Sequence, residues 1–274
     1  MASQTVNQTT NKPDSIKNRA LITGASGGIG LELAKIHAAG GGDLVLVARR
    51  LDVLEGIKND LEKQYGIQVI VLAKDLTQDA APQEIYDELN AKGIKIDYLI
   101  NNAGFGDQGL FYQQDVRKNE DMIAVNVRAL MVLTRLFLPE CVARGSGRIL
   151  NVASTAGFLP GPLSSVYYAT KAFVVSFTEA LSNEFAGTGV TITALCPGPV
   201  ATGFAATANF DGSKLFATGV ASAYTVALCG YRGMMKGKTL VFNDWKLKFL
   251  LKWIVPFLPR KLVLKISRSL TEKG

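Results

Sequence analysis

Two side chains that can exchange a proton, Tyr167 and Lys171, stand four residues apart in Tyr167-Tyr168-Ala169-Thr170-Lys171. Residues four apart share one face of a helix, so this phenol and this ammonium can reach a common site, whereas Tyr168 points about 100° away. An unperturbed phenol has a pKa of about 10, and a nearby cation favours the phenolate. The spacing therefore predicts that Tyr167 is an acid/base group whose pKa Lys171 lowers toward the neutral range.

A glycine-rich turn joins the first predicted strand, Arg19–Thr23, to a predicted helix, Gly28–Ala39. Glycines let the backbone approach a pyrophosphate, whose charge is favoured by the unpaired N–H groups and the dipole at a helix N-terminus. The position between a strand and a helix favours a dinucleotide site over a purely structural loop. The residues predicted to bind the cofactor here are Thr23, Gly24, Ser26, Gly28, Ile29 and Gly30.

The end of the second predicted strand, Asp43–Ala48, indicates which dinucleotide is selected, because Arg49 and Arg50 follow it. Enzymes that select NAD usually place Asp or Glu about 20 residues after the glycines to accept from the ribose 2′-hydroxyl. A guanidinium group instead binds a 2′-phosphate with two hydrogen bonds. The arginines therefore favour NADP(H) over NAD(H), with Arg49 as the main contact. The alternative is a pair of solvated arginines at a helix start.

Short β-branched runs alternate with longer helical patterns along the chain. This alternation predicts a single-domain, Rossmann-type, doubly wound α/β fold with a mostly parallel sheet of about seven strands and helices on both faces. Ligands bind such a sheet at the carboxyl ends of its strands. The predicted strands are 19–23, 43–48, 68–73, 97–100, 148–152, 190–195 and 239–242, and the predicted helices are 28–39, 51–65, 80–91, 119–138, 164–185 and 220–235.

These motifs, in this order, resemble those of the short-chain dehydrogenase/reductase family over roughly residues 18–204. The glycine turn resembles the family's TGxxxGxG, and Tyr167 to Lys171 matches YxxxK, with Ser154 at the expected distance before it. The resemblance implies that Lys171 also binds the nicotinamide ribose. It further implies that Asn126, on the helix after the fourth strand, holds a water that connects Lys171 to solvent.

The same resemblance implies further cofactor contacts at the ends of three strands. After the third strand, an acid near the adenine amino group corresponds to Asp75, which Leu76 follows. After the fourth, the NNAG segment walls the adenine side of the cleft, and after the sixth, the PGxVxT segment borders the nicotinamide. The residues that match these two segments are Asn102, Ala103 and Gly104, then Pro197, Gly198, Val200 and Thr202.

The residues together predict hydride transfer between a nicotinamide and a carbonyl or alcohol carbon. Tyr167 would protonate the carbonyl oxygen, and Ser154 would donate a hydrogen bond to it as negative charge develops there. Reduction of a ketone or aldehyde with NADPH is the direction that the family resemblance favours. An apolar substrate is indicated by the segment after Thr202, where the family closes over its substrate, since this segment contains Phe204, Phe210, Leu215 and Phe216.

Two alternatives stay open beside this interpretation. The first is a 3-oxoacyl-thioester reductase, since the same groups serve ketones and β-ketoacyl substrates. The second is a non-catalytic NADP-binding regulatory or scaffold protein. Intact Ser154, Tyr167 and Lys171 argue against the second, because cofactor binding alone has less use for a phenol opposite a lysine. A homodimer or homotetramer is a further expectation from the family.

Composition excludes several other classes. The 274 residues, 48% of them apolar, suffice for one core, and no linker divides them. Cys141, Cys196 and Cys229 share no CxxC spacing and His37 stands alone, so we expect no metal site and structural roles for these side chains. No apolar signal stretch occurs in residues 1–18, which makes the cytoplasm the expected location.

The net charge of +7 is concentrated in residues 232–274, which carry 11 Lys/Arg against 2 Asp/Glu. The remainder carries 19 against 21, so the body of the chain has no nucleic-acid footprint. A charged cluster at 115–121, which includes Lys118, is interpreted as a solvated helix start.

The chain is expected to divide into a flexible arm (1–17), a dinucleotide-binding and catalytic domain (18–243) and a basic, apolar helical extension (244–274). Helical spacing in the extension places Trp245, Phe249, Trp253 and Phe257 near one face and two lysines opposite. Lysines and prolines interrupt it too often for a transmembrane span. Three alternatives remain: packing against the domain or a second subunit, a lid over an apolar substrate, and peripheral contact with an anionic membrane.

Overall fold

A parallel seven-stranded sheet forms the centre of the molecule, with strand order β3-β2-β1-β4-β5-β6-β9. The computed structural model describes residues 18–204, 208, 210 and 219–272. The sheet confirms the doubly wound α/β fold predicted from the alternating pattern. Its strands are β1 (Arg19–Thr23), β2 (Asp43–Ala48), β3 (Val69–Ala73), β4 (Tyr98–Asn101), β5 (Gly147–Val152), β6 (Val190–Leu195) and β9 (Leu240–Val241).

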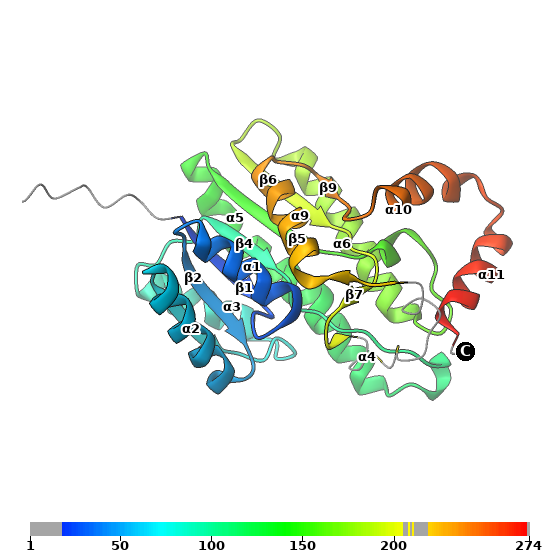
Figure 1. Cartoon of the computed structure of the whole chain (residues 1–274), viewed down its shortest axis with the longest axis horizontal. Coiled ribbons are helices and arrows are strands. Elements are labelled where there is room, and N and C mark those ends of the chain that lie inside the picture. The colour runs from blue at the N-terminus through cyan, green and yellow to red at the C-terminus, as the bar shows by residue number, and fades with distance from the viewer. Residues whose placement is uncertain (1–17, 205–207, 209, 211–218, 273–274) are drawn as a thin grey trace, which may run out of the picture.

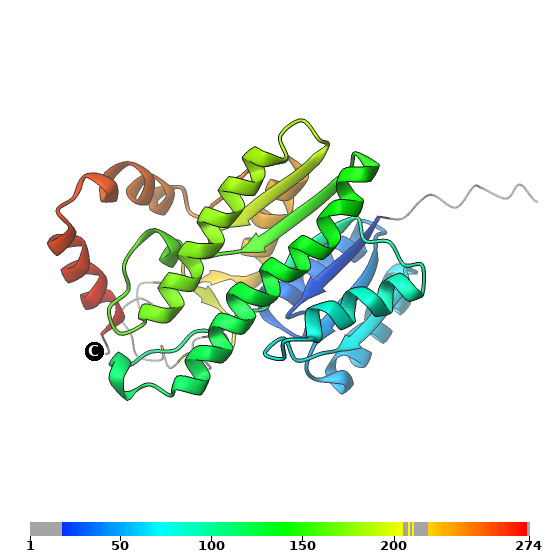
Figure 2. The ribbon, with the colours of Figure 1, turned by 180° about the vertical axis from the view of Figure 1, so that it is seen from behind.

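Helices cover both faces of this sheet, as Figures 1 and 2 show from opposite sides. Right-handed βαβ crossovers place successive helices on one face until the direction of strand addition reverses. One face carries α1 (Gly28–Ala39), α2 (Leu51–Tyr65) and α9 (Ala223–Met235). The other face carries α3 (Ala81–Ala91), α5 (Leu130–Arg144) and α6 (Ser165–Glu184).

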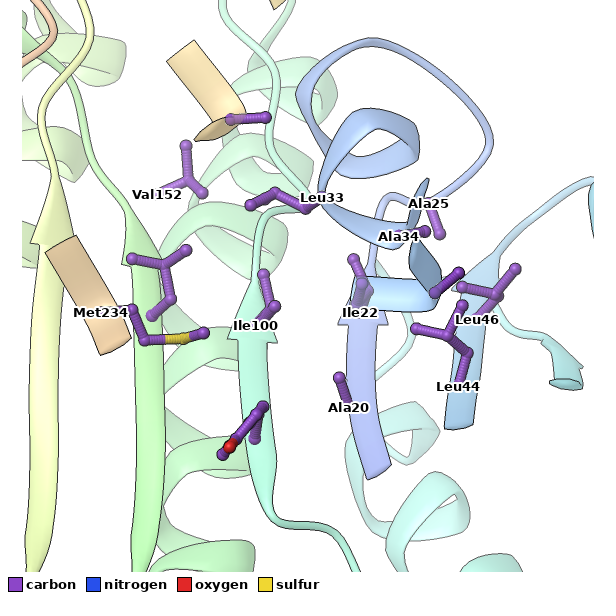
Figure 3. Packing of buried hydrophobic residues seen from close by; sticks show 14 of the residues in the cluster. Ala20, Ile22, Ala25, Leu33, Ala34, Leu44, Leu46, Ile100, Val152 and Met234 are labelled. Atoms are coloured by element: carbon purple, nitrogen blue, oxygen red, sulfur yellow. The ribbon is translucent and has the colours of Figure 1, made fainter. Parts of the chain in front are cut away.

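The strands are apolar on both faces because both faces are covered. Leu33 of α1 points toward Ile100 of β4 and Val152 of β5, and all three belong to one buried cluster (Figure 3). Val45 of β2 faces the other side of the sheet and belongs to the cluster under α3 and α5. The two clusters fix the sheet between its helical layers and so hold the ends of its strands in place.

The reversal in strand order falls between β1 and β4, which pair in parallel. Loops from these two strands diverge to opposite faces of the sheet, and the crevice between them is where doubly wound folds bind ligands. The carboxyl ends of β1, β4 and β5 are Thr23, Asn101 and Val152. The predicted glycine turn, the segment after Asn101 and Ser154 therefore begin at the same edge of the sheet.

The helix expected at 119–138 is longer and contains a π-helical turn. It runs through α4 (Val116–Ile123), η2 (Ala124–Ala129) and α5. The Asp115 carboxylate caps its start by accepting from the Arg117 N–H at 2.9 Å, and Gly145 at φ 66° ends it. In the described part of the chain, this 116–144 helix alone has the length and composition to cross a membrane, but 50% of its most apolar window is buried against the fold.

Short elements complete the fold around the edge of the sheet. The 3₁₀ turns η1 (Phe111–Gln113) and η3 (Thr155–Phe158) lie in the loops after β4 and β5, and β7 (Val200–Ala201) pairs with β8 (Ala221–Ser222). The helix expected at 220–235 begins later, at Ala223, because Ala221 and Ser222 belong to β8 and the Ser222 hydroxyl caps α9.

The C-terminal segment leaves β9 and forms an arc at one edge of the molecule (Figures 1 and 2). It consists of α10 (Trp245–Phe249), the π-helical η4 (Leu250–Ile254), the 3₁₀ turn η5 (Val255–Phe257) and α11 (Arg260–Thr271). The arm expected at 1–17, and Leu215 and Phe216 of the expected substrate-closing segment, lie outside the described residues.

Candidate active site

The glycine turn after β1 is so closely packed that two of its positions admit only glycine. Gly24 has φ 66°, and a Cβ added there would lie 2.9 Å from Ala103 Cα. A Cβ added at Gly30 would lie 2.3 Å from the Gly24 carbonyl oxygen. Distances this short are steric clashes with backbone, so α1 can start against the turn only without a side chain at these positions.

Hydrogen bonds tie this turn to the end of β4. The Asn102 side-chain amide donates to the carbonyl oxygens of Thr23 at 2.9 Å and Gly24 at 3.2 Å. In return, the Thr23 hydroxyl accepts from the backbone N–H groups of Asn102 and Ala103, both at 3.0 Å. The two predicted cofactor-binding segments are therefore one rigid unit, and Asn102 is a positioning residue within it.

The N-terminus of α1 is suited to an anionic group. Its N-cap residue is Gly27, no side chain caps the first turn, and no acidic residue lies there. The first N–H groups of α1 thus keep their capacity for an external acceptor, and the helix dipole favours an anion. Ser26 and Ile29 are partly exposed beside this end. A Cβ on Gly28 would lie 3.1 Å from Thr202 Cγ2, which places Thr202 across the turn.

The remaining residues expected at the adenosine side lie at the ends of β2 and β3. Arg49 and Arg50 are exposed, and Arg50 is the N-cap residue of α2. Asp75 is half-buried and its carboxylate accepts from the Thr77 N–H at 3.1 Å, while Leu76 is buried. Two cations at the end of the strand next to β1 fit a 2′-phosphate in this fold.

Tyr167 and Ser154 form a hydrogen-bonded pair at the carboxyl end of β5. Ser154 is the N-cap residue of η3, and its hydroxyl oxygen accepts from the Ala156 N–H at 3.1 Å. Tyr167, in the first turn of α6, is 8% exposed. Burial raises the pKa of the Tyr167 phenol above its usual value, and the hydrogen bond with Ser154 opposes this rise.

Lys171 lies one turn further along α6, with its Nζ 5.8 Å from the centre of the Tyr167 ring. It donates to the Val152 carbonyl oxygen at 2.9 Å. Burial lowers the pKa of Lys171 to about 8. The expectation that Lys171 lowers the pKa of Tyr167 does not describe this structure, in which burial is the largest influence on both groups: it raises the pKa of the Tyr167 phenol and lowers that of Lys171.

Asn126 lies in the π-helical turn η2 and is 1% exposed. Its side-chain amide donates to the Phe105 carbonyl oxygen at 2.9 Å and to the Thr170 hydroxyl at 3.1 Å, and it accepts from the Phe105 N–H at 3.1 Å. An added Cβ on Gly104 would lie 2.9 Å from Asn126 Oδ1 and 3.3 Å from Lys171 Nζ. Asn126 and Lys171 therefore both lie against Gly104, in the space that a side chain at this position would occupy.

The segment after β6 lies beside Ser154. The Pro197 carbonyl oxygen accepts from the Thr155 N–H at 2.9 Å and from the Ser154 hydroxyl at 3.5 Å. The Gly198 N–H donates to Asn243 Oδ1 at 3.2 Å, and Val200 is buried in β7. The structure thus brings Pro197, Gly198 and Thr202 to the same edge of the sheet as the glycine turn and Tyr167.

Aromatic rings cover the Tyr167 side of this edge. The ring centres of Tyr167 and Phe204 are 5.4 Å apart, those of Tyr167 and Phe210 are 6.3 Å apart, and the two phenylalanine rings stack at 6.2 Å. The two described phenylalanines of the segment after Thr202 therefore make the surroundings of the Tyr167 phenol apolar.

Two polar groupings were not found from the sequence. Lys118, interpreted as part of a solvated helix start, forms a salt bridge of 2.6 Å with buried Asp107. Asn101 donates to Asn151 Oδ1 at 2.9 Å and so links β4 to β5 below the site. Neither pair gives a local signal, because its members are far apart in the sequence. His37 is 2% exposed and its Nδ1 lies 2.9 Å from the Tyr231 hydroxyl, while Cys141 and Cys196 are buried and Cys229 is half-buried.

The fold and this arrangement define a Rossmann-type dinucleotide-binding protein with a Ser-Tyr-Lys centre. The sequence matches the short chain dehydrogenase family over residues 18–211. The chain belongs to this family, which confirms the resemblance found in its motifs.

The chain is also similar to individual proteins. The very-long-chain 3-oxoacyl-CoA reductase of Bos taurus is 34% identical over 189 residues, which are 67% of this chain and 59% of that protein. The ketoacyl reductase HetN of Nostoc sp. is 35% identical over 208 residues, 76% of this chain and 71% of that protein. A short-chain dehydrogenase from Sphingobium yanoikuyae, solved in complex with NADPH, superposes with a TM-score of 0.78 at 30% identity and covers 89% of this chain and 97% of its own.

Proposed function

We propose that this protein reduces a hydrophobic carbonyl compound to the alcohol with NADPH. The observation that carries the proposal is the Ser154–Tyr167 hydrogen bond with Lys171 one helical turn away, at the edge where the glycine turn begins. A protein that only bound a dinucleotide would have little use for a buried phenol, serine and lysine facing one another. This geometry favours the enzymatic proposal over the non-catalytic scaffold.

The chain's own groups supply the proton and the stabilisation of charge in this reaction. Bound nicotinamide would supply the hydride to the carbonyl carbon. Ser154 would donate a hydrogen bond to the carbonyl oxygen, and the Tyr167 Oη would protonate that oxygen. The raised phenol pKa keeps Tyr167 protonated at neutral pH, which is the form in which it would enter this direction of the reaction. Lys171 would return a proton to the phenol, and Asn126, which also lies against Gly104, would hold the water that connects Lys171 to solvent.

The residues that would hold the cofactor lie along the reversal in strand order. The N-terminus of α1 would bind the pyrophosphate, with the close approach made possible by Gly24 and Gly30. Arg49 and Arg50 would bind the 2′-phosphate, while Lys171 would contact the nicotinamide ribose. Asp75 and the segment from Asn102 would border the adenine, and the segment from Pro197 to Thr202 would border the nicotinamide.

A 3-oxoacyl thioester is the substrate class we favour, which was the alternative left open by the sequence. Two of the similar proteins are named as 3-oxoacyl-CoA and ketoacyl reductases. The rings of Phe204 and Phe210 beside Tyr167 favour an apolar chain next to the reacting carbonyl. The cytoplasmic location and a homo-oligomeric state stay predictions.

Substrate class is tested by following NADPH absorbance with 3-oxoacyl-CoA thioesters and with simple ketones of matched chain length. We expect kcat/KM to rise by about fourfold per added methylene, or about fifteenfold per two, while the chain remains in contact with apolar side chains, since each buried methylene contributes about 0.8 kcal/mol. Higher kcat/KM for small charged carbonyl compounds would contradict the apolar site. Higher kcat/KM for ketones than for thioesters would instead favour a simple ketone as the substrate class.

Cofactor preference is tested separately by the Arg49→Asp variant. An acid at this position would repel a 2′-phosphate and accept from a 2′-hydroxyl, so we expect the Kd ratio to shift toward NADH by about a hundredfold or more. Titration of the intrinsic fluorescence with NADPH and NADH measures both Kd values. An Arg50→Asp variant serves as the matched comparison. An unchanged ratio of the two Kd values in Arg49→Asp would show that Arg49 does not bind the 2′-phosphate.

A further inference from the structure

The outward surface of the C-terminal segment is apolar and aromatic. Trp245, Phe249 and Trp253 recur every four residues along α10 and η4, so they lie on one side of the helix. Their exposed fractions are 73%, 55% and 66%, and Phe257 in η5 is 80% exposed. We call these four residues the aromatic surface. Soluble monomers rarely leave large aromatic side chains clustered in water without a partner.

The opposite side of the same helix packs on the body of the molecule. Leu251 is 5% exposed, and a Cβ on Gly198 would lie 3.0 Å from Leu247 Cδ1. Further along, α11 docks through buried side chains, since the Ser267 hydroxyl donates to the Pro160 carbonyl oxygen at 2.7 Å and the Thr271 hydroxyl to that of Pro162 at 2.9 Å. The segment is thus fixed at both ends, and the aromatic surface faces away from these contacts.

Basic side chains accompany the aromatic surface. Residues 245–272 contain seven Lys or Arg and one acidic residue, Glu272. The helix formed by α10 and η4 also carries three exposed lysines, Lys246, Lys248 and Lys252. Among the residues that the structure describes, the one ion pair of this segment joins Arg268 to Glu272. Most of the positive charge is therefore available to a negatively charged partner.

We propose that the aromatic surface and its lysines bind the protein to an anionic lipid bilayer. Trp and Phe side chains favour the boundary between headgroups and acyl chains, and flanking lysines are attracted to anionic lipids. A second copy of this chain is a poor partner, because a symmetric contact would bring the same lysines together. Residues 1–17 carry two lysines and one aspartate, so they offer no complementary charge.

Intrinsic fluorescence reports on this surface directly, because Trp245 and Trp253 are the two tryptophans of the chain. The full chain is mixed with phosphatidylcholine vesicles that contain either no phosphatidylserine or about one-third phosphatidylserine. We expect the emission to shift to shorter wavelength with the anionic vesicles and to be quenched by lipids that are brominated on the acyl chain. High salt should return the emission to the wavelength of the free protein. No shift with the anionic vesicles would overturn the proposal.

Vesicle sedimentation with variants tests the two parts of the surface. The triple variant Lys246→Gln, Lys248→Gln, Lys252→Gln should bind about a hundredfold more weakly, since each lysine near the membrane contributes about a factor of five. The triple variant Trp245→Ala, Phe249→Ala, Trp253→Ala should lose sedimentation with all vesicles. These substitutions are at exposed positions, and circular dichroism checks that the variants fold.

Matched controls carry the same changes elsewhere. Phe111, Tyr112 and Val116 are 65%, 79% and 68% exposed, and their triple alanine variant should sediment as the unmodified chain does. The exposed lysines Lys63, Lys92 and Lys95 provide the corresponding control for charge. Equal losses in the controls would overturn the proposal. So would a blue shift that appears with rising protein concentration and no vesicles, because that result would assign the aromatic surface to contact between copies.

Discussion

The two sides of α6 that carry Tyr167 and Tyr168 bury the same kind of side chain against different partners. Tyr167 is 8% exposed and Tyr168 6%, so burial does not distinguish them. Tyr167 forms its hydrogen bond with Ser154 at the end of β5, whereas Tyr168 forms one with Ser267 of α11. One side of the helix therefore faces the candidate active site and the other faces the C-terminal segment.

The comparison shows that partners, not burial, separate a reactive phenol from a structural one. Burial raises the pKa of both phenols, that of Tyr168 to about 12. The Tyr167 side also has Lys171, whose pKa is lowered to about 8. On the Tyr168 side, a Cβ on Gly161 would lie 2.2 Å from the ring, so the loop before α6 packs directly on it. We expect changes on the first side to affect turnover and changes on the second to affect stability.

The largest difference is expected between Tyr167→Phe and Tyr168→Phe. Loss of the proton donor should lower kcat by about 10² to 10⁴, while the Kd for NADPH changes little because the glycine turn is untouched. Tyr168→Phe keeps the buried ring and should change kcat by less than about threefold. Steady-state rates and fluorescence titration measure both quantities. Equal losses of kcat in the two variants would contradict the assignment of Tyr167 as the proton donor and of Tyr168 as a structural residue.

The sequence could predict this distinction because helical periodicity separates neighbouring residues. The alternation of strand and helix patterns was enough to predict the parallel sheet, and the position of the glycines after a strand placed Gly24 and Gly30 at one edge of it. Ser154 was assigned through the family resemblance. Long-range packing was not predictable. The Tyr168–Ser267 hydrogen bond joins α6 to the far end of the chain, and no local pattern indicates it.

Electrostatic balance was also beyond the sequence. The spacing of Tyr167 and Lys171 gives their distance along a helix but says nothing of how much water each retains. In the structure, desolvation is the largest influence on both, so that Tyr167 stays a phenol and Lys171 is easily deprotonated. The hydrogen bonds of Asn126 in the π-helical turn likewise join it to residues far along the chain, Phe105 and Thr170, and no local pattern indicates them.

An effect of intermediate size is expected for the Lys171→Met variant, in the way its free energy of unfolding depends on pH. The pKa of Lys171 falls from 10.5 in the unfolded chain to about 8 in the folded one, so the folded chain binds fewer protons between these values and its free energy of unfolding rises with pH there. Below pH 8 the buried cation costs about 3 kcal/mol. Removal of the cation should therefore stabilise the protein by up to this amount at pH 7, less about 1 kcal/mol for the lost hydrogen bond to Val152.

Urea unfolding of both proteins between pH 7 and pH 10.5 measures the difference. The advantage of Lys171→Met should shrink as the pH rises, and turnover should be lost at every pH. A difference in stability that did not vary with pH would show that Lys171 is not buried as a cation. A matched variant on the other side, Tyr168→Phe, should show no such dependence below about pH 10, because burial raises the pKa of Tyr168 from 10.0 to about 12 and the phenol stays protonated in both states there.

The smallest effect is expected from Ser267→Ala, which acts on the Tyr168 side alone. The Ser267 hydroxyl donates to the Pro160 carbonyl oxygen at 2.7 Å and is 3% exposed, so its loss leaves that oxygen and the Tyr168 hydroxyl with one partner fewer. Buried hydrogen bonds of this kind contribute about 1 kcal/mol each, which predicts a decrease of about 1 to 2 kcal/mol in the free energy of unfolding. Urea unfolding measures this decrease, and kcat should stay within about twofold because the Ser267 hydroxyl bonds to Pro160 and Tyr168, on the side of α6 away from Ser154. A fall in kcat as large as that expected for Tyr167→Phe would mean that the docking of α11 controls the catalytic side of α6, and the two sides could then no longer be treated as independent.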